Sequence, residues 1–572
     1  MKPIRLDGRS LGRAQLVEVA HGASVELDAG ALRDVARAAD FLAGKVEHRE
    51  PIYGVSTGFG SNADKLLGGS DASIYAKLQR NLIETHAVCV GEPFAPEVVR
   101  AMLCIRVNTL LRGHSGIRVQ TLQALAAMLN AGVVPVVPQL GSVGASGDLA
   151  PLSHLAIVLI GGGEAFHGGE RMPGGEALRR AGLQPVELTI KEGLALNNGT
   201  AQMLATGVLA LQTLEDLLDT ADIAAAMSLE AFAGRLGAYA EEVHALRPHP
   251  GQVHVAARLR GLLAGSTLAD IAYARVRGKK VQPQDSYSLR CVPQVHGAVR
   301  DAVAQAARVL EIELNAVTDN PLVFPEAVDA PLDRQVISAG HFHGMPLALA
   351  MSYVKAAIPV LASISERRLN KLVDPSTNDG LPAFLIGNED GTESGHMIVQ
   401  YTAAAIVNDL SSRAMPASVY SIPTSANAED HVSMGANEAR HVLAMADDLG
   451  KVLGLELYTA AQALDLRRDM INAARDLADR ADAEAFAAKV QGGPLPDAPD
   501  RAAFVAEVDG LRAELAQAEA YRPGRAVSAA HAAIRQRIAF LDRDRAMDGE
   551  VAVAVRMVAD GSVLHASRSA MR

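Results

Sequence analysis

The chain has 572 residues, of which 49% are hydrophobic and 21% charged, and its formal net charge at pH 7 is −11. This acidic balance, the absence of tryptophan and an aromatic content of 4% argue against a nucleic-acid-binding surface. Unbroken apolar stretches such as residues 155–160 are too short to span a bilayer. Lys2, Arg5 and Asp7 precede no apolar segment, so we expect neither a signal peptide nor a membrane partner.

The cysteines indicate a reducing compartment. Cys89, Cys104 and Cys291 are odd in number, widely spaced and surrounded by apolar residues. This pattern favours reduced core thiols over a disulfide framework, so we expect a cytoplasmic protein.

Long segments with apolar residues at three- and four-residue spacing dominate the chain. Several exceed the usual helix length, which predicts a bundle whose central helices are buried from several sides, in part by other subunits. These segments are residues 97–131, 200–240, 295–318, 344–371 and 433–475. The motifs that carry chemical groups fall in the connections 51–62, 141–148, 192–199, 282–291, 338–344 and 421–435.

The connection GSVGASGDLAPLSHLA, residues 141–156, contains a tripeptide that can form an electrophile from its own backbone. In a sharp bend, the amide nitrogen of Gly147 can attack the carbonyl carbon of Ala145 and close a five-membered ring that loses two waters. Gly147 has no Cβ to obstruct the attack, and Ser146 supplies the hydroxyl whose elimination leaves an exocyclic methylene. The product is 4-methylidene-imidazol-5-one (MIO), an electron-poor Michael acceptor.

Two plainer interpretations of this stretch compete with ring formation. A loop with a helix N-cap would explain GASGD alone, but the surrounding run is far longer. A dinucleotide-binding loop would need GxGxxG after a strand, whereas the pattern is GxxGxxG and Pro135 and Pro138 break the strand. Residues from Leu149, with Pro151 in the first turn, predict a helix start whose dipole favours electron density arriving on the ring.

Residues 141–156 resemble the signature of the MIO-dependent aromatic amino acid ammonia-lyases and aminomutases. The resemblance covers residues 40–475 and 526–565. It implies an all-α fold, a large multi-helix bundle of the fumarase/aspartase-like type with a MIO-bearing loop domain. It also implies an amino acid substrate, MIO formed from Ala145, Ser146 and Gly147 as the cofactor, and a homotetramer in which three chains build each site. The histidines show no metal-binding spacing such as HExxH, so no metal is expected.

The resemblance assigns roles to two further motifs. YGVSTGFG, residues 53–60, resembles the loop whose tyrosine is the catalytic base, so Tyr53 would take the β-proton of the substrate. QDSYSLRC, residues 284–291, offers Arg290 for the substrate carboxylate, with Gln284 and Tyr287 holding the site. Without this resemblance, a packed tyrosine ring and an ordinary surface ion pair would be the simpler interpretations.

Two more motifs complete the predicted site. ALNNGT, residues 195–200, supplies Asn198, which the resemblance places near the MIO and the substrate. HFHG, residues 341–344, supplies Phe342, which is expected to pack beside the MIO and the substrate ring.

The substrate is predicted from His86 and Glu429. NLIETHAVCVGEP, residues 81–93, places His86 where histidine lyases have histidine, and TSANAEDHVSMG, residues 424–435, places Glu429 where they have glutamate. A carboxylate and an imidazole suit a ring with two nitrogens better than a phenyl group. Tyrosine-specific lyases and aminomutases also use a histidine near the position of His86.

Several residues depart from the histidine-lyase pattern. Asn197 stands where an apolar residue is usual, Ala428 replaces a common glutamine, YGVST replaces YGINT, and PLSHLA is similar to the aromatic-lyase version. The expected function is therefore elimination of ammonia from L-histidine to give trans-urocanate. A tyrosine or phenylalanine ammonia-lyase, a 2,3-aminomutase and a non-catalytic helical assembly protein are the alternatives.

A segment without family resemblance interrupts the C-terminal part. Residues 476–522 are rich in Ala, Asp, Glu and Arg and contain GGPLPDAP at 492–499, and Phe504, Val508, Leu511 and Leu515 follow at 4-3-4 spacing. This pattern predicts a helical hairpin or short coiled coil. The expected division is an N-terminal MIO-containing domain at 1–200, a central bundle at 201–475, an inserted hairpin at 476–525 and a helical tail at 526–572.

Overall fold

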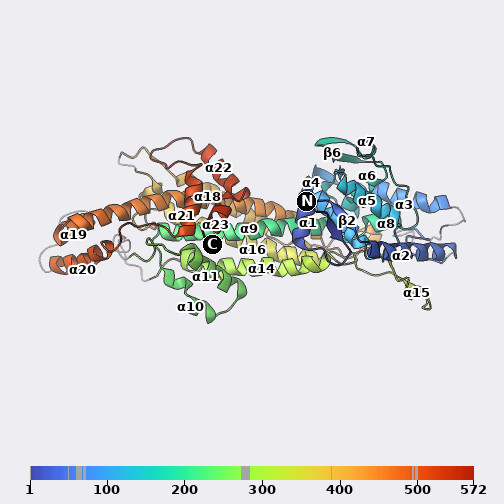
Figure 1. Cartoon of the computed structure of the whole chain (residues 1–572), viewed down its shortest axis with the longest axis horizontal. Helices are drawn as coiled ribbons and strands as arrows, with labels where there is room; N and C mark the ends of the chain where they lie inside the picture. The colour runs from blue at the N-terminus through green and yellow to red at the C-terminus, as the bar shows by residue number, and fades with distance from the viewer. Residues whose placement is uncertain are drawn as a thin grey trace. The chain divides into compact units, whose positions relative to one another are not determined.

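The computed structural model describes residues 2–48, 50–58, 67, 72–271, 284–387, 390–491, 495 and 500–571. Helices dominate this part of the chain and the strands are short (Figure 1), which confirms the all-α class. The chain divides into two compact units. The first unit comprises Met1–Gln212, Ala304–Lys355 and Met415–Ala444, and the second comprises Thr213–Val303, Ala356–Ala414 and Met445–Arg572.

Helix α4 (Pro96–Leu110) lies in the core of the first unit. All residues from Val98 to Leu110 except Arg100 are buried, because the sequence VVRAMLCIRVNTL has apolar side chains on every face of the helix. Pro96 occupies the first turn, where its missing N–H is not needed.

Other helices and short strands complete the first unit. The helices are α1 (Arg13–Ala20), α2 (Ala29–Glu47), α3 (Ala72–His86), α5 (Val119–Asn130), α6 (Leu149–Leu159), α7 (Gly174–Arg180), α8 (Glu192–Asn197) and α15 (Leu332–Gln335). Strands β1 (Ile4–Leu6) and β2 (Val25–Leu27) are parallel. The antiparallel pairs are β3 (Val90–Pro93) with β5 (Pro138–Leu140), β4 (Val134–Pro135) with β6 (Glu164–His167), β6 with β7 (Glu170–Pro173), and β8 (Leu322–Val323) with β9 (Val336–Ile337).

The structure corrects two expected elements of this unit. Residues 97–131 form two helices, because α4 ends at Leu110 and α5 begins at Val119. Gly113 and Gly116 between them have φ of +70° and +69°, and a Cβ at either would stand within 2.9 Å of α2. Residues 192–199, expected as a connection, contain the buried helix α8.

Long helices lie side by side in the second unit (Figure 1). These are the parts of α9 (Ala201–Ala231), α14 (Val292–Glu313), α16 (Met345–Val373) and α18 (Gly435–Arg480) that belong to this unit. A buried carboxylate on α18, Glu456, accepts hydrogen bonds from Arg368 on α16 at 2.6 Å and from Ser228 on α9 at 2.8 Å. The bundle core is therefore held by polar bonds as well as apolar packing.

Further elements of the second unit are shorter than α9, α14, α16 and α18. They are η2 (Leu236–Tyr239), α10 (Glu241–Ala245), α11 (Pro250–Leu262), α13 (Tyr287–Arg290), η3 (Ala383–Leu385), α17 (Met397–Arg413), α21 (Arg525–Arg535), α22 (Asp548–Ala559) and α23 (Ser562–Met571). Helices α21 and α23 pack against each other.

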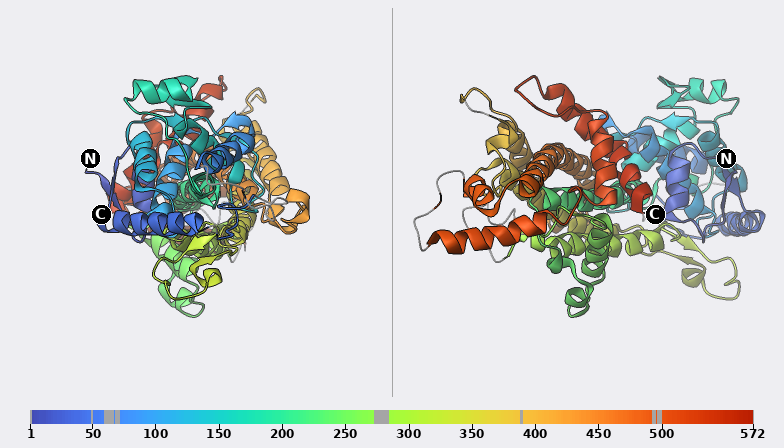
Figure 2. Two further views of the ribbon diagram at one scale, coloured as in Figure 1. Left: turned by 90° about the vertical axis from the view of Figure 1, so that its right-hand side faces the viewer. Right: turned by 60° about the vertical axis from the view of Figure 1, so that its left-hand side comes forward.

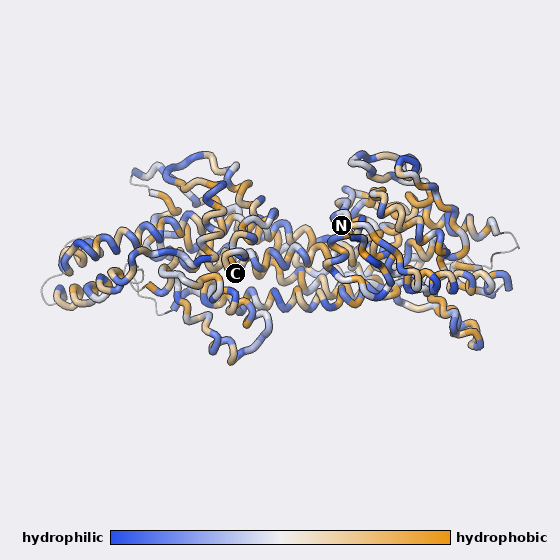
Figure 3. The backbone as a smooth tube through the Cα atoms, in the orientation of Figure 1, coloured by the Kyte–Doolittle hydropathy of each residue, from blue (hydrophilic) through white to orange (hydrophobic). Residues whose placement is uncertain are grey.

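Two helices follow α18 and lie side by side in Figures 1 and 2, α19 (Ala483–Gln491) and α20 (Asp500–Leu515). Hydrophilic and hydrophobic residues interleave along both (Figure 3). Phe486 and Val508 are buried, and Arg501 pairs with Glu484 at 2.7 Å. The predicted GGPLPDAP connection lies outside the described residues except for Leu495. The four-part domain division stays a prediction.

Helix α16 is apolar enough, by length and composition, to cross a membrane. However, 61% of its most apolar window is buried inside the protein. It is the one helix of this kind among the described residues, and this burial is typical of the core helix of a bundle.

Candidate active site

Ala145, Ser146 and Gly147 lie in the turn between β5 and α6. Gly144 and Gly147 have φ of +67° and +72°, a conformation that residues with side chains rarely adopt. A Cβ on Gly147 would stand 2.0 Å from the carbonyl oxygen of Gly199. The chain therefore turns sharply here and passes so close to a second segment that glycine alone fits.

That second segment is Asn198–Gly199. The Gly199 N–H donates to the carbonyl oxygen of Ser146 at 3.2 Å, and the Asp148 N–H donates to the carbonyl oxygen of Gly199 at 2.7 Å. Gly147 and Gly199 form a parallel bridge. These backbone bonds hold the tripeptide against the segment that carries the predicted Asn198.

Asp148 supports the same turn, although sequence analysis did not single it out. One carboxylate oxygen accepts from the backbone N–H groups of Gln202 at 2.9 Å and Met203 at 3.0 Å, and the other accepts from Ser142 Oγ at 2.8 Å. Burial raises the pKa of Asp148 to about 6, although these hydrogen bonds oppose the shift. The available signal was a carboxylate directly before the predicted helix start at Leu149.

Glu429 contacts the tripeptide directly. Its Oε1 accepts a hydrogen bond from Ser146 Oγ at 2.9 Å, and its Oε2 accepts one from Thr424 Oγ1 at 2.7 Å. His86 ends helix α3, where burial lowers the pKa of its imidazole and the charge of Glu429 opposes that shift. Glu429 therefore contacts Ser146, and His86 lies within electrostatic range of Glu429.

Asn198 is 2% exposed, and hydrogen bonds hold its side chain in place. Its Nδ2 donates to Asp319 Oδ1 and to the carbonyl oxygen of Asn320, both at 3.2 Å. Asp319 also pairs with Lys191 at 2.6 Å, and both side chains are fully buried. A buried ion pair thus orients the predicted substrate-binding amide.

Tyr53 and Phe342 lie in the same unit. Tyr53 is half-buried and lines a cavity of about 360 Å³ with Pro321, Leu332 and Ser338. Phe59 and Gly60 of the same predicted motif lie outside the described residues.

Phe342 is half-buried in a turn. The next residue, His343, contacts the loop that carries Glu429. The ring of His343 stacks on that of His431 with centroids 5.8 Å apart, and its Nε2 lies 3.1 Å from the carbonyl oxygen of His431. The HFHG turn and the loop carrying Glu429 are therefore held together.

The other three predicted residues belong to the second unit. Gln284 is exposed, and Tyr287, which begins α13, is 71% exposed. The Arg290 guanidinium lies 4.6 Å from the centre of the Tyr287 ring, and its Nε donates to the carbonyl oxygen of Asp285 at 2.9 Å. The aromatic ring and the cation are thus presented together.

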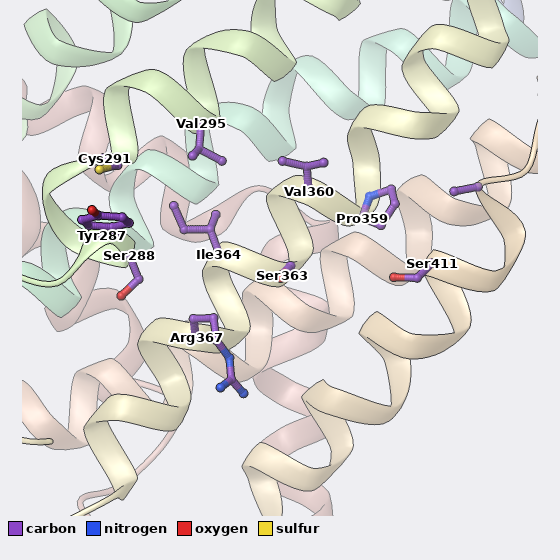
Figure 4. A pocket seen from close by; sticks show the side chains of 11 residues that line it. Tyr287, Ser288, Cys291, Val295, Pro359, Val360, Ser363, Ile364, Arg367 and Ser411 are labelled. Atoms are coloured by element: carbon purple, nitrogen blue, oxygen red, sulfur yellow. The ribbon is translucent and has the colours of Figure 1, made fainter. Parts of the chain in front are cut away.

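A cavity of about 600 Å³ adjoins Tyr287. Figure 4 shows Tyr287 and Ser288 at one end and Pro359 and Ser411 at the other. Cys291 also lines this cavity and is half-buried, in contrast to Cys89 and Cys104, which are buried and whose thiol pKa values burial raises to about 12. Within the described ranges, no group of three His, Cys, Asp or Glu side chains could hold a metal ion.

A family model for aromatic amino acid lyases matches residues 11–490. The chain belongs to the aromatic amino acid lyase family. This lyase is 51% identical to the histidine ammonia-lyase of Symbiobacterium thermophilum over 459 residues, which cover 80% of this chain and 87% of the relative. Membership makes the protein a carbon–nitrogen lyase.

Solved structures share the fold of this lyase. The crystal structure of histidine ammonia-lyase from Trypanosoma cruzi matches with a TM-score of 0.81 and 33% identity, covering 99% of this chain and 95% of that one. The tyrosine aminomutase of Streptomyces globisporus matches with a TM-score of 0.83 and 32% identity, covering 100% and 99%. The bundle is therefore the ammonia-lyase and aminomutase fold.

Proposed function

We propose that this lyase is a histidine ammonia-lyase, which eliminates ammonia from L-histidine to give trans-urocanate and ammonia. The high identity to the Symbiobacterium histidine ammonia-lyase supports the proposal. The observation that carries it is the hydrogen bond of 2.9 Å between Glu429 and Ser146, because it places a carboxylate suited to imidazole beside the reactive tripeptide.

The residues present fit the MIO group that the family implies. Gly199 approaches so closely that only glycine fits at position 147. Ala145 is buried, and Ser146 carries the hydroxyl that must leave. When formed, this group supplies an electrophile that turns the substrate amine into a good leaving group.

Ring formation changes the surroundings of Glu429. Loss of the Ser146 hydroxyl removes the donor to Oε1, while Thr424 continues to hold Oε2. The carboxylate then keeps its orientation and has an open acceptor for a ring N–H of histidine. His86, whose pKa burial lowers, would contact the other side of the imidazole.

The other assignments follow the family motifs. Tyr53 removes the β-proton, and Arg290 binds the substrate carboxylate as a charged fork. Asn198 binds the substrate near the ring, Gln284 and Tyr287 hold the site, and Phe342 packs beside the imidazole.

A tyrosine-specific lyase or a 2,3-aminomutase is the second candidate, because the Streptomyces tyrosine aminomutase is as similar in structure as the Trypanosoma enzyme. Glu429 favours histidine. A phenyl ring offers no donor to Oε1 once the Ser146 hydroxyl is lost, whereas a ring N–H of histidine is such a donor.

Exposed apolar residues support the proposed homotetramer. Leu349, Tyr353 and Val360 on α16 are 57%, 53% and 49% exposed, and their spacing puts them on one helix face. Ile398 and Tyr401 on α17 are also exposed. Such faces mark subunit interfaces in soluble proteins. We place the enzyme in the cytoplasm, where thiols such as Cys104 stay reduced.

Purified protein incubated separately with L-histidine, L-tyrosine and L-phenylalanine tests the substrate. We expect urocanate absorbance to increase with histidine and no comparable cinnamate or coumarate signal. Preferred formation of coumarate, or of a β-amino acid, would establish the second candidate.

A further inference from the structure

Arg106 lies inside α4 and is 1% exposed, which is rare for arginine. Its Nη1 donates to the carbonyl oxygen of Asn198. Within the described part of the chain, its Nε and Nη2 have no hydrogen-bond partner. Burial lowers the pKa of Arg106 to about 10, opposed by the charge of Asp319, so the guanidinium stays charged at neutral pH.

The peptide group between Asn198 and Gly199 connects Arg106 to the tripeptide. Its carbonyl oxygen accepts from Arg106, and its N–H donates to the carbonyl oxygen of Ser146 at 3.2 Å. Hydrogen bonds in such a chain polarise one another. The positive charge therefore strengthens the Gly199 N–H as a donor to Ser146.

This peptide is also confined. A Cβ on Gly199 would stand 2.5 Å from Thr318 Oγ1 and 2.7 Å from Arg106 Nη1, and its φ is +118°. Gly199 also forms a parallel bridge with Gly147. Arg106 and the tripeptide therefore both contact the Asn198–Gly199 segment.

We propose that Arg106 is a positioning residue for ring formation by Ala145, Ser146 and Gly147, acting through the Asn198–Gly199 peptide. The inference rests on the proposed MIO function.

In ring formation, a bond forms between the Gly147 nitrogen and the Ala145 carbonyl carbon. The Ala145 oxygen leaves as water with the protons of the Gly147 and Ser146 nitrogens, and a carbon–nitrogen double bond remains. The second water takes the Ser146 hydroxyl and the Ser146 α-proton, leaving a carbon–carbon double bond. No oxidant or reductant is needed.

The second dehydration is the step that Arg106 assists. Loss of the α-proton places negative charge on the adjacent carbonyl oxygen of Ser146, which is the atom that the Gly199 N–H contacts. A fixed donor aimed at an oxygen where charge develops lowers the barrier. Removing the charge of Arg106 weakens this donor and loosens the segment that carries it.

If Arg106 only stabilised the fold, its substitution would lower stability without slowing ring formation in the folded protein. A buried guanidinium carries a desolvation cost, so Arg106→Met, which keeps much of the side-chain length, should not lower stability greatly. Arg100 provides a matched control. It lies on the same helix and donates to the carbonyl oxygens of Val19, Ala23 and Leu129, none of which belongs to residues 141–156 or 198–199.

The experiment follows ring formation itself in Arg106→Met, Arg106→Gln, Arg106→Lys, Arg100→Met and wild-type protein. Mass spectrometry of the peptide spanning 141–156 measures the fraction lacking two waters over time after synthesis, and circular dichroism reports folding. We expect Arg106→Met and Arg106→Gln to fold and to form the ring on the order of tenfold more slowly or worse. Arg106→Lys should be faster than Arg106→Gln, and Arg100→Met should match wild type.

Ring formation at the wild-type rate in folded Arg106→Met would overturn the inference, and if that variant does not fold, Arg106→Gln decides in the same way. Equal slowing in Arg100→Met would also overturn it, because the effect would then come from disturbing α4. Wild-type protein without the two-water deficit would instead refute the proposed MIO function.

Discussion

Glu429 holds two neighbours at once, Ser146 through Oε1 and Thr424 through Oε2. When ionised, a carboxylate has two acceptor oxygens and no donor. A glutamine of the same shape has one acceptor oxygen and one NH2 group that donates. We therefore expect the charge of this side chain, and not its size, to distinguish an imidazole from a phenyl ring.

We expect Glu429→Gln to reduce turnover of L-histidine by about 100-fold or more, as for other positioned acid–base groups. Any weak activity on L-phenylalanine or L-tyrosine should be equal or higher, because glutamine places no negative charge beside the aromatic ring. Steady-state assays on the three amino acids measure both effects. The exposed neighbour Asp430 supplies the control Asp430→Asn, which should change neither; unchanged histidine turnover in Glu429→Gln would contradict the substrate assignment.

Ser146→Ala tests the tripeptide. The hydroxyl that must leave is absent, so we expect a folded protein with almost no activity and no two-water deficit in the peptide spanning 141–156. Mass spectrometry and near-ultraviolet difference absorbance provide the measurement. Full turnover in this variant would refute MIO as the electrophile.

At the scale of elements, the segment after α20 is fixed to the bundle of the second unit. The Tyr521 N–H donates to Asn472 Oδ1 at 2.8 Å, and the Gly524 N–H donates to Glu230 Oε1 at 2.7 Å. Glu230 is fully buried on α9, and burial raises its pKa to about 7. The attachment therefore includes a carboxyl group that is costly to ionise.

This predicts a pH-dependent stability. The folded state holds the Glu230 proton up to about pH 7, and the unfolded state releases it near 4.5. The contribution of protonated Glu230 to the free energy of unfolding is therefore fully present below pH 4.5 and is lost as the pH rises to 7. We expect Glu230→Gln to change the melting temperature little at pH 5 and to stabilise the protein at pH 8, by on the order of 3 kcal/mol.

Thermal unfolding at the two pH values checks this expectation. Glu242→Gln, at an exposed position, serves as the control and should leave both melting temperatures unchanged. A Glu230→Gln protein whose stability falls by the same amount as wild type between pH 5 and pH 8 would exclude this role.

At the scale of the whole molecule, the exposed apolar side chains of α16 and α17 support the proposed homotetramer. Apolar side chains at Leu349, Tyr353 and Tyr401 are more than half exposed. Water contact with a row of such side chains is unfavourable, and a closed homotetramer would remove it.

We expect light scattering to give a tetramer for the wild-type protein. The double substitution Leu349→Lys and Tyr353→Glu should lower the molar mass and abolish activity, because charges at a buried interface are unfavourable. An active wild-type monomer at working concentration would contradict the assembly.

Much of the candidate site could be predicted because its signals are local. The glycines around Ser146, the helix beginning at Leu149 and the paired carboxylate and imidazole of Glu429 and His86 are all patterns of adjacent residues or family motifs. The break between α4 and α5 was not predicted, because Gly113 and Gly116 interrupt an apolar pattern that continues on both sides. Their conformation follows from packing against α2.

By itself, the sequence determined the helical class and the family, and it predicts the reactive tripeptide, because each depends on residue types at short spacing. Only the tertiary structure showed that Arg106 lies behind Asn198, 92 residues away, and that Glu429 reaches Ser146 across 283 residues. An arginine inside an apolar helix carries no local mark of its partner. Its role depends on which distant backbone group contacts it in the folded chain. Here that group is the carbonyl oxygen of Asn198, which packs against the buried helix α4.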